Sequence, residues 1–238
     1  MRKYNWIGFL PFYLLTAILF IGAAMWGSKT TTTIVQNRPI LRQNTVVIDA
    51  GHGGIDTGAT SCSGVMESKI NLDIARKLEA VMQLLGYDTV MIRNTDTSVY
   101  TEGNTIASQK VSDLKQRVRI ANETENAILI SIHQNTYPDD RYSGAQVFYG
   151  GADNSKELAQ ILQSGLNQTL CRSSKRNTKK ATGVYLMQNI ACTGVLIECG
   201  FLTNPAEEAK LRSEQYQKQL CCVIACAVSA FADSQNQG

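Results

Sequence analysis

Short apolar runs rich in Val and Ile alternate with helix-length segments along most of this 238-residue chain. A run of four to eight such residues, bounded by polar or Gly-containing turns, is typical of a strand buried on both faces. The sequence predicts strands at 45–49, 88–93, 127–133, 145–150, 183–187 (an edge strand) and 194–200. It predicts helices at 71–86, 112–123, 154–170 and 214–231, where apolar residues recur with helical spacing.

Strands that alternate with helices of this length indicate an α/β fold. We expect a single three-layer domain at 44–232, with a twisted sheet, mostly parallel or mixed, and helices on both faces. A polar tail at 233–238 follows the domain. The polar stretch 94–111 predicts an irregular loop before a helix that opens on Ser112, and Asn154 is the expected cap of a later helix.

The N-terminal segment differs from the rest of the chain. Arg2 and Lys3 precede an uncharged, mostly apolar span at 7–26, which is long enough to cross a bilayer about 30 Å thick. The sequence therefore predicts a signal-anchor or transmembrane segment at 1–28 and a polar, Thr-rich linker at 29–43. A cleaved signal peptide is the alternative. In either case we expect the domain outside the cytoplasm, anchored to the cytoplasmic membrane or secreted.

Charge and cysteine content exclude several classes. A net charge of +3 without a nucleic-acid-binding motif argues against a nucleic-acid partner. Seven cysteines are an odd number, which argues against a complete disulfide framework in an exported chain. No CxxC pair occurs, so a thiolate zinc cluster is not expected.

Ligands of open α/β sheets bind outside the carboxyl ends of the strands. The polar residues at those ends are Asp49, His52, Arg93, His133, Asn135 and Glu198. Glu67 stands just before the first predicted helix, and the chain contains only two histidines. Two His and a Glu match a catalytic zinc site that keeps a fourth position for water. Each residue alone has an ordinary structural explanation, so the prediction depends on the combination.

Other chemistries are the alternatives to a zinc site in this sequence. The chain lacks the G-x-S-x-G motif of serine hydrolases and the HExxH motif of common zinc proteases. A thiol peptidase would use Cys199 or Cys62 as nucleophile, with His52 or His133 as base. A non-catalytic binding module remains a third alternative.

Four ordered motifs resemble one family. "VVIDAGHGGIDTGA", "MESKINLDIARKL", "ILISIHQN" and "GVLIECGFLTNPAEE" look like the zinc-dependent N-acetylmuramoyl-L-alanine amidases of the amidase-3 type. The resemblance covers about 45–231. It implies zinc ligands His52, Glu67 and His133, and Glu198 as the catalytic carboxylate. It also implies the substrate, which is peptidoglycan glycan strands carrying stem peptides, cut at the amide between N-acetylmuramic acid and L-alanine.

Further roles are expected from the arrangement of the site and from the charge of the chain. Asp49 is expected to orient a ligand histidine from behind, and Asn135 and Arg93 to contact substrate. "SIHQNT", together with a short catalytic domain, resembles the CwlD-type sporulation branch, which acts on spore cortex. The basic run at 172–180 offers a contact for anionic wall polymer or for an activating protein partner.

Overall fold

The computed structural model describes residues 42–172 and 174–235. The predicted segment at 1–28 and nearly all of the linker at 29–43 lie outside the described residues. Within the described part of the chain, every helix is too short or too polar to span a bilayer.

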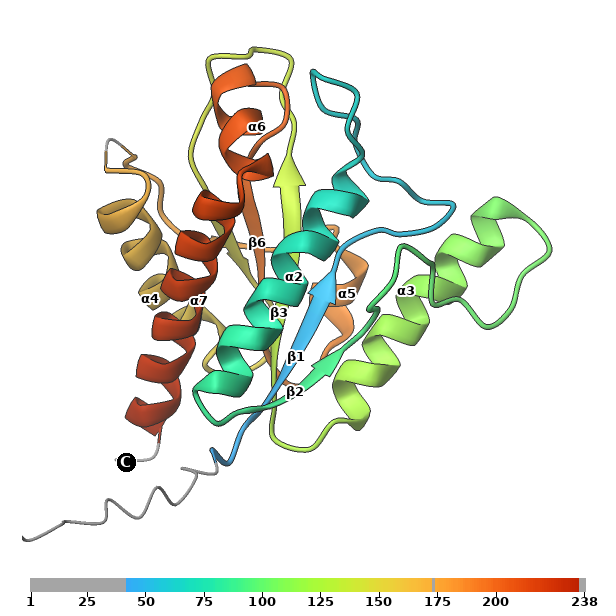
Figure 1. Ribbon diagram of the computed structural model, residues 1–238. Helices are drawn as coiled ribbons and strands as arrows, with labels where there is room; N and C mark the ends of the chain where they lie inside the picture. The colour runs from blue at the N-terminus through green and yellow to red at the C-terminus, as the bar shows by residue number, and fades with distance from the viewer. Residues whose placement is uncertain (1–41, 173, 236–238) are drawn as a thin grey trace, which may run out of the picture. The chain divides into compact units, whose positions relative to one another are not determined.

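The described residues form one α/β unit (Figure 1). Its elements are β1 (Thr45–Ala50), α2 (Glu67–Leu84), β2 (Asp88–Met91), α3 (Ile106–Glu123), β3 (Ala127–Asn135), β4 (Gln146–Tyr149), α4 (Ser155–Thr169), β5 (Lys179–Lys180), α5 (Tyr185–Asn189), β6 (Thr193–Phe201), α6 (Pro205–Arg212) and α7 (Glu214–Gln235).

The strands form one mixed sheet in the order β2-β1-β3-β6-β4-β5. The four strands β2, β1, β3 and β6 run parallel, β4 runs antiparallel to β6, and β5 runs parallel to β4. The parallel group therefore places the carboxyl ends of β1, β3 and β6 at one edge of the domain. This arrangement confirms the predicted mixed sheet.

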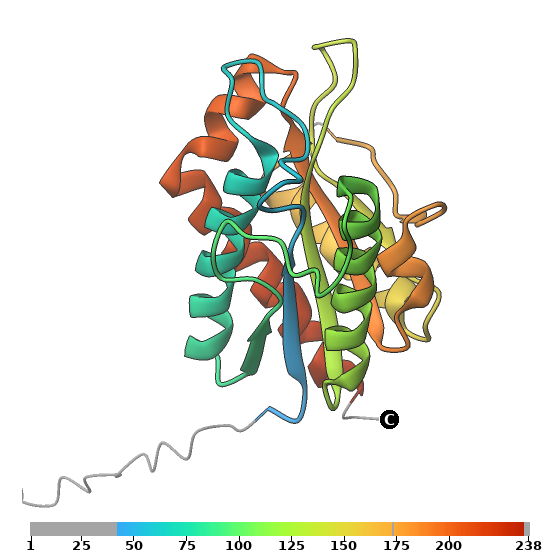
Figure 2. The same ribbon diagram turned by 90° about the vertical axis from the view of Figure 1, so that its right-hand side faces the viewer.

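Helices cover both faces of the sheet, as predicted (Figure 2). One face packs against α2, α4 and α7 through a large cluster that includes Val46, Ile48 and Ile130. The other face packs against α3 and α5 through a smaller cluster that includes Val47 and Leu129. Successive strand residues point to opposite faces, so each central strand contributes to both clusters.

The start of α3 differs from the prediction. The helix begins at Ile106 rather than at Ser112, because Thr105 and Ser108 form a reciprocal capping box. Ser112 lies inside the helix, and its hydroxyl accepts hydrogen bonds from the backbone N–H groups of Thr101 and Glu102. The predicted loop at 94–111 is thus shorter and is fastened to the helix that follows it.

Two other expectations were also wrong. Residues 185–187 of the predicted strand 183–187 form the start of helix α5, and β5 is the edge strand instead. Short apolar runs cannot be assigned to strand or helix from their pattern alone. Asn154 occupies the position before α4, but its backbone is left-handed and its side chain donates to Gln235 instead of capping the helix.

Helix α6 was not predicted. It follows β6 directly, and Asn204 caps it by accepting hydrogen bonds from the N–H groups of Ala206 and Glu207. Pro205 holds the first helical position, where its missing N–H has no structural cost.

Candidate metal centre and active site

The loop after β1 brings its backbone against a second strand. A Cβ atom on Gly51 would lie 2.2 Å from the ring of His133, so only glycine fits there. His52 follows with a φ of 63°, in the left-handed region that non-glycine residues seldom occupy. Gly53, with a φ of 130°, then turns the chain away. Gly51 is therefore required by the close approach of this loop to His133 of β3, and Gly53 by its backbone conformation.

Three side chains from distant parts of the sequence meet at this loop. His52 Nε2 lies 3.4 Å from Glu67 Oε2, and His133 Nδ1 lies 3.2 Å from Glu67 Oε1. The two imidazole centroids are 5.0 Å apart. One ligand atom from each residue lies within 4.8 Å of the others, so the three donors can converge on a single metal ion.

Glu67, the first residue of α2, is fixed by neighbouring donors. The N–H of Ala59 donates to Oε2 at 3.0 Å, and the N–H of Gln134 donates to Oε1 at 3.0 Å. Burial would raise the pKa of the Glu67 carboxyl, but His133 and His52 outweigh burial and hold the pKa far below its usual range. The carboxylate is therefore charged at any ordinary pH.

The protonation of His52 reflects the same concentration of negative charge. Burial would lower the pKa of its imidazole, but Glu67 and Asp56 outweigh burial and raise the pKa to about 9. A site that favours positive charge to this degree, with two imidazoles and a carboxylate, has the donor set of a His₂Glu zinc centre. The residues present thus fit the metal that the sequence predicts.

Glu198 lies on β6, paired in register with His133 on β3. Burial raises the pKa of its carboxyl, and its Oε2 is buried with no hydrogen-bond partner among the described residues. A buried polar atom without a partner is costly and is typical of groups reserved for a ligand or for catalysis. Glu198 is therefore a carboxyl beside the metal donors that is free to act on a bound molecule.

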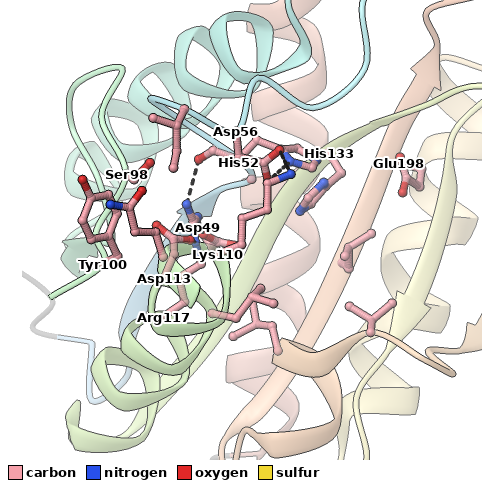
Figure 3. A pocket seen from close by; sticks show the side chains of 17 residues that line it. Asp49, His52, Asp56, Ser98, Tyr100, Lys110, Asp113, Arg117, His133 and Glu198 are labelled. Atoms are coloured by element: carbon pink, nitrogen blue, oxygen red, sulfur yellow. Dashed lines mark hydrogen bonds and ion pairs between the residues drawn. The ribbon is translucent and has the colours of Figure 1, made fainter. Parts of the chain in front are cut away.

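These groups open into a pocket of about 350 Å³ on the α3 and α5 side of the sheet (Figure 3). Its lining includes His52, Tyr100, Lys110, His133, Val184 and Glu198. Both histidines and Glu198 line it, together with Ser98 and Tyr100 of the loop before α3, so a substrate entering the pocket reaches the two histidines and Glu198 together.

The Asp49 carboxylate forms no hydrogen bond with either histidine. Its carboxylate accepts hydrogen bonds from Arg117 on α3 and from the hydroxyl of Ser131. The carboxylate that contacts a histidine is Asp56, whose Oδ2 lies 2.9 Å from His52 Nδ1. The expected role of Asp49 therefore passes to Asp56, which lies four residues after His52 in the same motif.

Arg93 and Asn135 were expected to contact substrate; the structure shows the Arg93 guanidinium bound to the protein's own backbone, while the role of the Asn135 side chain stays a prediction. The buried guanidinium of Arg93 donates to the carbonyl groups of Ala50 and Gly51, as well as to two further carbonyl groups. Asn135 ends β3, where its carbonyl group accepts a hydrogen bond from the N–H of Leu202. Arg93 thus stabilises the backbone of the loop that carries His52.

Arg117 is a site residue that the sequence analysis missed. It donates to Asp49, to the carbonyl of Ala50 at 3.0 Å and to the carbonyl of His52 at 2.7 Å. It is four residues before the buried Ala121, on the inward face of its helix. An arginine on that face was the available signal, because a buried charge requires partners.

The cysteines of the thiol-peptidase alternative lie elsewhere. Cys199 is buried in the large apolar cluster on the other face, and burial raises the pKa of its thiol well above the usual value. Cys62 is exposed and does not line the pocket. Neither thiol shares the pocket with the histidines, which counts against this alternative.

Comparison with known proteins agrees with the site. The sequence model of a family described as N-acetylmuramoyl-L-alanine amidase matches residues 46–230. The germination-specific N-acetylmuramoyl-L-alanine amidase of Bacillus subtilis is 34% identical over 226 residues, which cover 94% of this chain and 92% of that protein. The amidase AmiA of Escherichia coli is 25% identical, over 78% of this chain and 75% of its own length.

Solved structures give the same result. The CwlD amidase from Clostridioides difficile, determined in complex with the GerS lipoprotein, superimposes with a TM-score of 0.76 at 34% identity. The match covers 80% of this chain and 99% of that one. An N-acetylmuramoyl-L-alanine amidase from Clostridium difficile 630 superimposes with a TM-score of 0.71 at 32% identity.

Proposed function

The chain belongs to the amidase-3 family of N-acetylmuramoyl-L-alanine amidases, and we propose that it is a zinc-dependent enzyme of the spore cortex. In this proposal it hydrolyses the amide that joins N-acetylmuramic acid to the L-alanine of the stem peptide. One observation carries it, which is the convergence of His52, Glu67 and His133 beside the unpartnered carboxyl of Glu198.

The site residues divide the chemistry between them. His52, Glu67 and His133 would hold zinc, which supplies Lewis acidity for amide hydrolysis when bound. Glu198 accepts a proton from the attacking water and returns it to the nitrogen of the leaving L-alanine. Its position on a central strand fixes the carboxyl, and the lack of a competing hydrogen bond leaves it free for this transfer.

The sporulation role is supported by the relatives. The protein matched over nine-tenths of both chains is a germination-specific amidase, and the solved CwlD amidase carries a lipoprotein partner. We therefore propose a role in cortex maturation and germination, and an accessory protein that binds this domain.

Substitutions of the three metal donors and of the proposed base test the proposal. His52→Ala, Glu67→Ala and His133→Ala should each lower bound zinc and abolish amide cleavage, because each removes one of three donors. Glu198→Gln should retain zinc and the wild-type melting temperature, while activity falls at least ~10²-fold, since the amide cannot accept the proton. The measurements are atomic absorption, a melting curve and release of stem peptides with free L-alanine amino termini.

Glu123→Gln, an exposed change of the same kind on α3, is the matched control and should leave all three measurements unchanged. Near-wild-type activity of zinc-loaded Glu198→Gln would refute the proposed base. Activity of the wild-type protein that survives complete zinc removal would refute the zinc proposal, and a zinc-loaded protein without activity on any peptidoglycan would favour the wall-binding alternative.

We further propose that 1–28 anchors the domain to the outer side of the cytoplasmic membrane. If this segment is retained, the full-length protein should stay with membranes after a carbonate wash, because about 20 apolar residues hold it there. A soluble mature form that begins near residue 28 would show cleavage instead.

A further inference from the structure

His52 is the least constrained of the three metal donors. Glu67 begins a helix and is held by two backbone N–H groups, while His133 lies within a central strand. His52 instead lies in a loop with a left-handed backbone between two glycines. Side-chain contacts must therefore set the direction of its ring, because no regular element does so.

Asp56 supplies the first such contact. Its Oδ2 lies 2.9 Å from His52 Nδ1, and its own position is fixed by a turn in which Gly53 and Asp56 exchange backbone hydrogen bonds of 2.7 and 3.2 Å. A carboxylate at Nδ1 favours the tautomer that carries its proton there. The other nitrogen, Nε2, is left facing Glu67, where the metal donors converge.

Lys110 on α3 supplies the second contact. Its Nζ donates to Asp56 Oδ1 at 3.0 Å, so the two carboxylate oxygens are divided between the histidine and the lysine (Figure 3). Lys110 and Asp56 are 54 residues apart in the sequence. The lysine is half exposed, and an exposed ion pair adds little to folding stability. Its effect is on the orientation of Asp56.

We propose that Asp56 and Lys110 are a positioning pair that aligns His52 with the metal. This inference rests on the proposed zinc function and adds to it two residues that act through a ligand. Helix α3 then governs His52 at two points, because Lys110 orients its ring through Asp56 and Arg117 binds its backbone carbonyl at 2.7 Å. Outer contacts of this kind fix ligand orientation and raise metal affinity.

The test is zinc affinity of the full-length protein, measured by competition with a chromophoric chelator. Asp56→Asn should weaken zinc binding about 10- to 100-fold, the usual effect of removing a carboxylate behind a ligand histidine. Lys110→Met should weaken zinc binding by a smaller factor, and Lys110→Arg should restore it. Because Lys110 acts through Asp56, the double variant should bind zinc no more weakly than Asp56→Asn alone.

Lys115→Met is the matched control, since Lys115 is an exposed lysine on the same helix with no bond to the site among the described residues. Its zinc affinity should equal that of the wild type. The melting temperature of each metal-free variant is measured in parallel and should stay at the wild-type value.

Wild-type zinc affinity in both Asp56→Asn and Lys110→Met would overturn the proposal. So would weakened binding accompanied by a lower melting temperature of the metal-free variants, because that result shows a structural role. A wild-type protein that binds no zinc would instead refute the proposed function. Loss of zinc in His52→Ala, with normal binding in the Asp56 and Lys110 variants, would refute the positioning pair alone.

Discussion

The two faces of the sheet use the same strands differently. On the face covered by α2, α4 and α7, the strand residues stay apolar to the carboxyl end, as in Ile48 to Ala50, Ile130 to Ile132 and Ile197 to Cys199. On the pocket face they change from apolar to polar, as in Val47 to Asp49, Leu129 to Ser131 and His133, and Leu196 to Glu198. One face therefore provides stability by apolar packing, and the other, the pocket face, provides the polar side chains of the site.

Polar residues on the pocket face remain buried only because they are paired. Asp49 and Arg117 are 1% and 3% exposed, and each has further partners, including Ser131 and the carbonyl of His52. Burial would raise the pKa of the Asp49 carboxyl, but Arg117 outweighs burial and holds that pKa below its usual range. The comparison thus predicts different costs for changes on each face.

The largest expected effect is on the pocket face. Arg117→Met leaves the Asp49 carboxylate buried and unpaired and should lower the free energy of unfolding by about 3–5 kcal/mol. Urea denaturation of the metal-free protein measures it. Adding Asp49→Leu should recover part of the loss, because an apolar pair of similar volume replaces the ions. Lys218→Met, which breaks an exposed pair with Glu214, is the control and should change stability by about 1 kcal/mol or less. A similar loss of stability in Arg117→Met and Lys218→Met would show that the buried ion pair of the pocket face matters no more than an exposed one.

The next largest effect is expected on the packing face, which is the face covered by α2, α4 and α7. Leu162 of α4 is fully buried, and Leu162→Ala should cost about 2–5 kcal/mol through lost burial and the cavity left behind. Zinc affinity and kcat of the folded protein should stay unchanged, because the residue lies behind the sheet from the pocket. Leu84→Ala, at a residue 85% exposed, is the matched control for stability. Altered zinc binding in Leu162→Ala would show that the two faces are coupled.

The sequence predicted the central strands well, because β1, β3 and β6 are apolar and rich in Val and Ile. It also pointed to the strand ends, where the structure brings His52, Glu67 and His133 within 4.8 Å of one another and places Glu198 beside them. Strand ends of a parallel sheet lie at one edge, so these residues were expected to meet.

The supporting contacts were not predictable in the same way. Lys110 lies in a stretch without apolar periodicity, and its partner Asp56 is 54 residues away, so no local pattern connects them. The start of α3 depends on a capping box between Thr105 and Ser108, which is a local hydrogen-bond arrangement within a polar segment. Arg93 was assigned to substrate because strand ends bind ligands, but its donors are engaged by backbone carbonyl groups.

The smallest expected effect is on the pH dependence of folding stability, which differs between the two faces. Cys221 of α7 is fully buried on the packing face, and burial raises the pKa of its thiol from 9.0 to about 12. The unfolded chain loses this proton above about pH 9 while the folded chain keeps it, so the thiol's contribution to stability is complete below pH 9 and disappears as the pH rises toward 12. At pH 10 the loss should be about 1.4 kcal/mol, since each unit between the two pKa values corresponds to that free energy. The pocket face behaves in the opposite sense, because the lowered pKa of Asp49 makes its contribution to stability decrease in acid.

Urea denaturation at pH 8 and pH 10 should show a smaller alkaline loss of stability in Cys221→Ala than in the wild type. Its exposed neighbour provides the control, and Cys222→Ala should keep the wild-type difference. Equal alkaline losses in Cys221→Ala and the wild type would show that Cys221 does not set the alkaline limit of the packing face.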